Sequence, residues 1–204
     1  MSIAATIIRS LSAIAAGTAI AASHAPAQMM PKAEQLGNFG ACLVRQGPTL
    51  SAKLARTPLG TPAEREAALT LSRAHNGCVR GAVLSGQVGA IRGSVAQALL
   101  MRQAAMLDTL AARPDAPAQR PANAEGRALV IAYATCLLNA APARTAALLR
   151  TPVASAEERP ALLAYGEALK QCTPEGIGYR IDLPDLRNHL ASIAYLQLAA
   201  GQTE

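Results

Sequence analysis

Apolar residues recur along this 204-residue chain in stretches of helical length, separated by short segments that contain Gly and Pro. Near the C-terminus, Leu186, Leu190 and Ile193 lie three or four residues apart, which is the spacing of one face of an α-helix. No stretch alternates β-branched and polar residues as a half-buried strand does. The pattern therefore predicts an all-α fold, with helices near 31–46, 51–56, 61–78, 92–112, 125–140, 155–172 and 184–200.

Two of these helices begin with the same kind of signal. Thr61 precedes Pro62 and stands three residues before Glu64, the spacing of a capping box with Pro in the first turn. Ser155 stands in the same way before Glu158. Because these side chains satisfy backbone amides that a helix start leaves unpaired, we expect both segments to be capped helix N-termini.

The two signals belong to an internal repeat. A shift of 94 residues places the first two cysteines on the last two, with 14 identities in the 37 positions that they enclose. With one inserted residue the match continues, so that Arg92 aligns with Arg187. The sequence predicts an ancient duplication that produced two tandem pseudo-symmetric units of about three helices each. We place these units at 28–112 and 125–204, joined by a Pro/Ala-rich linker at 113–124.

The N-terminus has the pattern of a secretory signal peptide. Residues 10–22 are apolar and uncharged, and Ala25-Pro26-Ala27 fits the small-residue pattern of a cleavage site before Gln28. The apolar run is too short to span a bilayer, which needs about 20 residues. We therefore expect residues 1–27 to be removed and the mature protein, without a transmembrane span, to be exported to the periplasm or beyond. The alternative is an apolar first helix that the mature fold retains.

The chain has four cysteines, an even number that indicates disulfides in an oxidising compartment. The repeat favours the pairs Cys42–Cys78 and Cys136–Cys172, and each bridge should stabilise the fold by about 3–4 kcal/mol in the chain-entropy model. The alternative is a zinc site at His75 and Cys78, but the second unit lacks that histidine and no Cys-x-x-Cys occurs. We expect no metal.

Composition excludes further classes. Aromatic residues are only 2% of the chain and the net charge of +6 is spread along it, which argues against nucleic-acid binding. Gly86, Gly89 and Gly93 do not have the spacing of a dinucleotide-binding or phosphate loop. We therefore expect no cofactor.

Anion binding by arginine is the chemistry that the sequence leaves open. Cations beside the glycine-rich loops and helix starts could hold a phosphate or carboxylate; the candidates are Arg80, Arg92, Arg180 and Arg187. The structural alternative, which the repetition of Arg92 at Arg187 favours, is that these residues pair with Glu64 and Glu158 or bond helix-end carbonyls.

The sequence constrains function mainly through the catalytic motifs that it lacks. After signal removal the histidines are His75 and His189, and no nucleophile motif accompanies either. We expect a non-catalytic binding or structural module of a bacterial envelope, the abundance of Ala and Arg suggesting a GC-rich bacterial genome. One alternative is an enzyme that uses either histidine in a cleft between the units. The other is an arginine-based binder of anionic surfaces, and the partner, a protein or such a surface, stays open.

Overall fold

The computed structural model describes residues 32–78, 87–121, 125–174 and 182–201. Within these ranges the chain is all-helical, as predicted, with ten α-helices, one 3-10 helix and no strand. The elements are α1 (Lys32–Gln46), α2 (Pro48–Arg56), α3 (Pro62–Ala74), the 3-10 helix η1 (Asn76–Cys78), α4 (Val88–Arg102), α5 (Ala104–Ala111), α6 (Gly126–Ala140), α7 (Pro142–Arg150), α8 (Glu158–Leu163), α9 (Glu167–Cys172) and α10 (Leu183–Ala200). The predicted signal peptide, residues 1–27, lies outside the described residues.

Proline sets several helix starts. In the first two positions of a helix, the missing amide hydrogen of proline costs no hydrogen bond. Four helices have a proline there: Pro48, Pro62, Pro142 and Pro184. Pro48 therefore both ends α1 and begins α2, which is longer than the segment predicted from 51. At the start of α3 the predicted cap is present, because the Glu64 amide donates to Thr61 Oγ1 at 3.3 Å.

Four sequence expectations need correction. The ranges 28–112 and 125–204, each predicted to contain about three helices, contain five described α-helices each. The helix predicted over 92–112 starts at Val88 and is broken at Gln103, where the backbone leaves helical geometry. The helix predicted over 155–172 is two short helices, because Gly166 adopts a positive φ of 51° and Tyr165 turns into the core. Ser155 does not cap a helix, since its hydroxyl has no hydrogen-bond partner and α8 begins only at Glu158.

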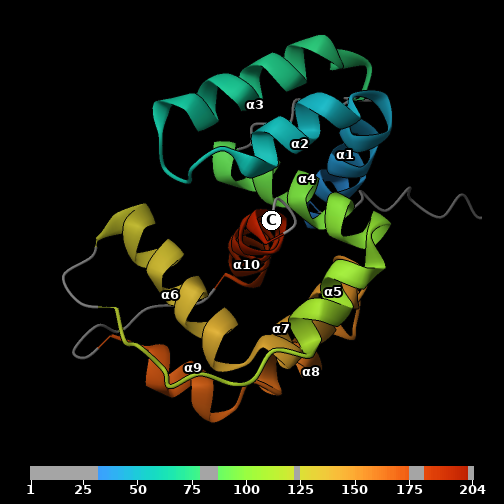
Figure 1. The fold of residues 1–204 in the computed structure, drawn as a ribbon. Coiled ribbons are helices and arrows are strands. Elements are labelled where there is room, and N and C mark those ends of the chain that lie inside the picture. The colour runs from blue at the N-terminus through green and yellow to red at the C-terminus, as the bar shows by residue number, and fades with distance from the viewer. Residues whose placement is uncertain (1–31, 79–86, 122–124, 175–181, 202–204) are drawn as a thin grey trace, which may run out of the picture.

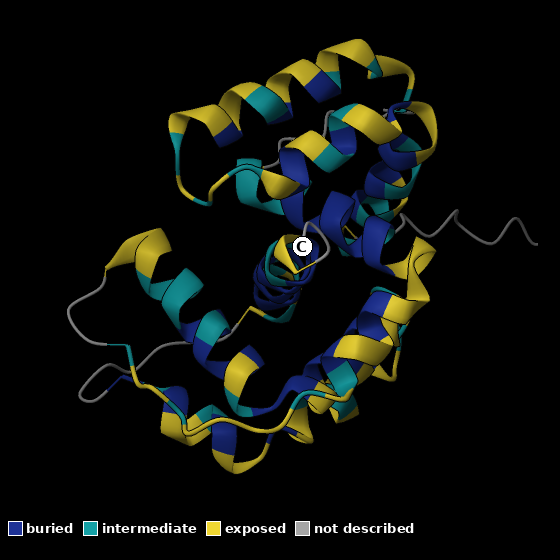
Figure 2. Cartoon of the chain, viewed as in Figure 1, coloured by how far each residue is buried: buried dark blue, intermediate teal, exposed yellow. Residues whose placement is uncertain are grey.

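The centre of the molecule is the pair formed by α4 and α10. Figure 1 shows α10 nearly end-on, with α1–α4 on one side of it and α5–α9 on the other, and Figure 2 shows that both central helices are largely buried. Their close approach requires a glycine: a Cβ on Gly93 would lie 2.3 Å from Cβ of Asn188. Gly40 plays the same part between α1 and α4, where a Cβ would lie 2.5 Å from the backbone of Ser94. Small residues thus let these helix backbones pack closely.

The disulfides pair as predicted. Cys42 of α1 bonds Cys78 of η1, and Cys136 of α6 bonds Cys172 of α9, with Cα–Cα distances of 5.6 and 5.7 Å. Each bridge ties a long helix, α1 or α6, to the third helical element that follows it in the chain. All four thiols are therefore bonded, and neither thiol catalysis nor thiolate metal binding is open to them in this state.

Two further features concern the chain as a whole. None of the described helices has the length and apolar character that crossing a membrane requires. The part of the predicted linker that is described, residues 113–121, forms no helix but lies against the second half of the chain. There the Ala116 amide donates to the Asn139 carbonyl at 2.9 Å and the Arg113 guanidinium donates to Gln197 at 2.9 Å.

Candidate functional site

Arg92, one of the four predicted anion-binding residues, lies on α4 with its side chain fully buried. Its guanidinium donates to the carbonyl oxygens of Ala55, at 2.7 Å, and Thr57, at the end of α2. The carboxylate of Glu64 lies 3.6 Å from the same group and also accepts from the Gly60 amide at 2.9 Å. Arg92 therefore joins the α2–α3 turn to the central helix.

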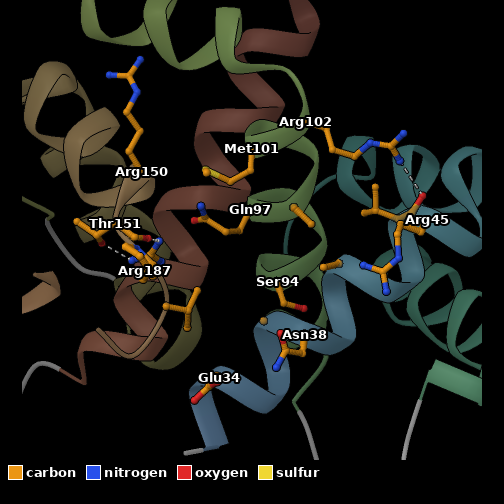
Figure 3. A pocket seen from close by; sticks show the side chains of 16 residues that line it. Glu34, Asn38, Arg45, Ser94, Gln97, Met101, Arg102, Arg150, Thr151 and Arg187 are labelled. Carbon is orange, nitrogen blue, oxygen red and sulfur yellow. Dashed lines mark hydrogen bonds between the residues drawn. The ribbon is translucent and has the colours of Figure 1, made fainter. Parts of the chain in front are cut away.

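Arg187, on α10, is bound in the same manner by the turn between α7 and α8. Its guanidinium donates to the carbonyl oxygens of Leu149, at 3.2 Å, and Thr151, at 2.6 Å. It also forms an ion pair with Glu158 at 2.6 Å, and Glu158 accepts from the Ala154 amide at 3.0 Å. Figure 3 shows Arg187 beside Thr151.

These contacts favour the structural alternative for both arginines. Burial lowers the pKa of Arg92 to about 10, against the opposing effect of Glu64, so the group stays charged near neutrality. Burial lowers the pKa of Arg187 as well. The two terminal nitrogens of each guanidinium are held by carbonyls and a carboxylate of this chain, which favours a structural role, while the buried Nε of each has no hydrogen-bond partner. The other two candidates, Arg80 and Arg180, lie outside the described residues.

Glu64 also receives a cation from the second half of the chain. The Arg127 guanidinium, on α6, donates to it at 2.7 Å, and the Arg127 side chain remains 38% exposed. His189 of α10 lies near this charge cluster, with its Nε2 3.6 Å from a carboxylate oxygen of Asp185. Burial lowers the pKa of His189, partly opposed by Asp185, so the imidazole is neutral near pH 7.

The two histidines form no recognisable catalytic arrangement among the described residues. His75 is half-buried against the junction of α1 and α2, where a Cβ on Gly47 would lie 2.2 Å from its Nε2. In this part of the chain neither imidazole is hydrogen-bonded to a serine, threonine or thiol that it could activate. Likewise, no three His, Cys, Asp or Glu side chains of the described ranges gather as metal ligands would.

The described residues form a groove of about 780 Å³. We call it the α1–α4 groove, because α4 forms its floor and α1 one wall, while residues 150–153 and Arg187 of α10 form the other wall (Figure 3). Its volume lies within the range of small-molecule sites. Its middle is apolar, lined by small side chains and by Met101, which is 50% exposed.

The charges of the groove are distributed unevenly. Arg45 lies in the last turn of α1 and Arg102 ends α4, both are exposed, and no described carboxylate lies within ion-pair distance of either. Arg102 donates to the Val44 carbonyl at 3.2 Å, which holds it beside the C-terminal end of α1. Glu34 lies in the first turn of α1, at the opposite end of that wall (Figure 3). Arg150, on the facing wall, already pairs with Asp108 at 2.5 Å.

Gln97 lies between these ends, on the floor of the groove (Figure 3). Its amide nitrogen donates to the Leu149 carbonyl at 2.5 Å, while its oxygen has no hydrogen-bond partner. The side chain is only 8% exposed, and an unpaired buried acceptor costs about 1–3 kcal/mol. The fold therefore supplies a partner for the amide nitrogen of Gln97 but none for its oxygen.

Sequence reasoning did not single out Arg45, Arg102 or Gln97. Arg45 carried one usable signal, since it is a cation in the last turn of the helix predicted over 31–46. Arg102 carried none, because it fell in the middle of the helix predicted over 92–112 and ends α4 only in the structure. Nothing in the sequence indicated that these two helix ends lie side by side or that Gln97 lies between them and residue 150. Comparison of the chain with protein-family models, with curated proteins and with solved structures gives no match.

Proposed function

We propose that this chain is an exported, non-catalytic binding module, built from two related helical units, that holds an anionic ligand in the α1–α4 groove. The observation that carries the proposal is the pair Arg45 and Arg102, which stand exposed and without a carboxylate partner beside an apolar floor. By contrast, Arg92, Arg127 and Arg187 each pair with a glutamate of this chain. The unpaired charge of Arg45 and Arg102 is therefore available to a ligand.

The two-unit origin is supported by equivalent contacts. The Arg92 acceptors Ala55 and Thr57 correspond, at the offset of 94 residues, to the Arg187 acceptors Leu149 and Thr151. The same offset relates the backbone amides that Glu64 and Glu158 accept from, and it relates the two disulfides. A shared ancestor explains why two different sequences build the same network.

Export is supported by the N-terminal pattern and by the disulfides. The small-residue stretch that ends at Ala27 fits signal cleavage, and two disulfides suit an oxidising compartment. The expected result of intact-mass measurement is a mature chain that begins at Gln28.

The binding proposal is tested with 8-anilinonaphthalene-1-sulfonate, a fluorescent probe that combines an apolar body with an anionic group. The double variant Arg45→Gln/Arg102→Gln should weaken binding about ten-fold, because it removes both charged donors. The control Arg56→Gln/Arg73→Gln makes the same change in net charge at exposed helix ends outside the groove. It should leave the dissociation constant nearly unchanged.

Salt supplies a second readout of the same proposal. Because exposed charges are screened, raising the ionic strength from about 0.05 to 0.5 M should weaken binding to the unmodified chain far more than to the groove variant. Equal binding by the groove variant and the control would contradict the proposal. Thermal unfolding of all three proteins identifies any variant whose loss of binding reflects unfolding.

A further inference from the structure

We infer that the ligand of the α1–α4 groove is a short apolar peptide with a free carboxyl end, which lies along α1 with that carboxylate at Arg45 and Arg102. This inference rests on the proposed function and names the ligand class for the same site. It uses three features of the groove together: its charged ends, its apolar middle and its unpaired buried acceptor.

The charged ends set the polarity and the length of the ligand. Arg45 and Arg102 offer donors for a carboxylate at one end, and Glu34 offers a carboxylate for an ammonium group at the other. Glu34 and Arg45 are eleven residues apart on one helix, which corresponds to about 16 Å along its axis. An extended chain of about five residues has this length. A peptide with both ends free carries the complementary charges at that separation.

The middle of the groove indicates what lies between those charges. Ala41, Ala98, Met101 and Val153 present small or flexible apolar surface, which favours small apolar side chains over charged ones. The unpaired oxygen of Gln97 accepts a hydrogen bond and cannot donate one, so it matches a peptide N–H. A simple aliphatic acid would use the arginines but would leave both Gln97 and Glu34 without a partner.

The inference is tested by calorimetric titration of the disulfide-bonded chain with the pentapeptide AVALA and with its end-blocked forms. Amidation of the carboxyl end should weaken binding about ten-fold, and acetylation of the amino end about three-fold, because the first removes a contact to two arginines and the second a contact to one exposed carboxylate. Decanoate is the probe for a simple aliphatic acid.

Variants assign each peptide end to its residue. Arg102→Gln should weaken binding of free AVALA but should not change the affinity for the amidated peptide. Glu34→Gln should likewise weaken binding of free AVALA but should not change the affinity for the acetylated peptide. Arg73→Gln, an exposed helix-end control outside the groove, should change neither. These paired comparisons detect the contact itself, since a general loss of structure would weaken every form of the peptide.

Two outcomes overturn the inference, and they bear differently on the proposed function. If decanoate binds more tightly than AVALA and Glu34→Gln has no effect, the ligand is an aliphatic acid; the peptide class is then wrong, while an anion-binding groove stands. If no probe, including the anilinonaphthalene sulfonate, responds to Arg45→Gln/Arg102→Gln, both the peptide class and the anion-binding groove are wrong.

Discussion

The turns around Arg92 and Arg187 contain equivalent contacts but differ in the balance of their charges. In both, a buried arginine of a central helix binds two carbonyls at the end of a preceding helix, and a glutamate caps the turn that follows. Glu64 faces two cations, Arg92 at 3.6 Å and Arg127 at 2.7 Å. Among the described residues, Glu158 pairs with Arg187 alone, at 2.6 Å.

This difference shows what each cluster contributes to the fold. The first cluster joins three elements, because Arg127 belongs to α6 and reaches Glu64 on α3. The second cluster is self-contained, and its charge balance depends on a single pair. A buried carboxylate that loses its only cation is strongly destabilising, whereas one that keeps a second cation is not. The two clusters should therefore respond unequally to the same substitution.

The largest effect is expected from Arg187→Met compared with Arg92→Met. Arg187→Met should lower the free energy of unfolding by about 3–5 kcal/mol, because Glu158 is left buried without a cation. Arg92→Met should cost about 1–3 kcal/mol, since the loss is mainly that of hydrogen bonds to carbonyls while Arg127 still balances Glu64. Urea denaturation at neutral pH measures both values.

The background variant Arg127→Gln sharpens this comparison. In it Glu64 depends on Arg92 alone, so Arg92→Met should become about as costly as Arg187→Met is in the unmodified chain. Strict additivity of Arg127→Gln and Arg92→Met would show that Arg127 does not balance Glu64. It would thereby remove the proposed difference between the clusters.

A second difference concerns His189, which aligns with Ser94 in the sequence when one inserted residue is allowed. Ser94 bonds the Ile91 carbonyl within its own helix and does not titrate. Burial lowers the pKa of His189 from 6.5, while Asp185 and Glu64 oppose this effect and Arg127 and Arg92 add to it. Of these two aligned positions, only that of His189 therefore carries a titratable group.

We expect the free energy of unfolding to depend on pH, and we expect His189→Ser to reduce this dependence. Because the folded pKa is depressed, the unfolded chain takes up the proton first as pH falls, so this contribution is complete above about pH 6.5 and declines below it. Each unit of pKa depression corresponds to about 1.4 kcal/mol. Urea denaturation across about pH 5–8 should give a flatter profile for the variant; an identical profile would mean that His189 ionises equally in both states.

The sequence predicted features that depend on short spacings or on the repeat, and it did not predict features that depend on tertiary packing. Helix starts at proline, the pairing of the cysteines and the alternative that pairs Arg92 with Glu64 all follow from short spacings or from the repeat, and the structure contains each of them. The break at Gly166 was missed because it is tertiary: Tyr165 enters the core and donates to Thr145 at 2.8 Å. The α1–α4 groove was missed for the same reason, since it combines four segments distant in sequence.

The smallest predicted effect comes from the turns that the two glutamates cap. Gly60 and Ala154 occupy equivalent places in them, with φ of 76° and 61°, and each donates its amide to the following glutamate. Positive φ is strained for alanine but not for glycine, so Ala154→Gly should raise stability by about 0.5–1 kcal/mol and Gly60→Ala should lower it by a similar amount. A Cβ on Gly60 would meet no atom within 4 Å, so a steric clash does not enter. Urea denaturation of the two single variants tests this directly: changes of the same sign would mean that the two turns are not conformationally equivalent.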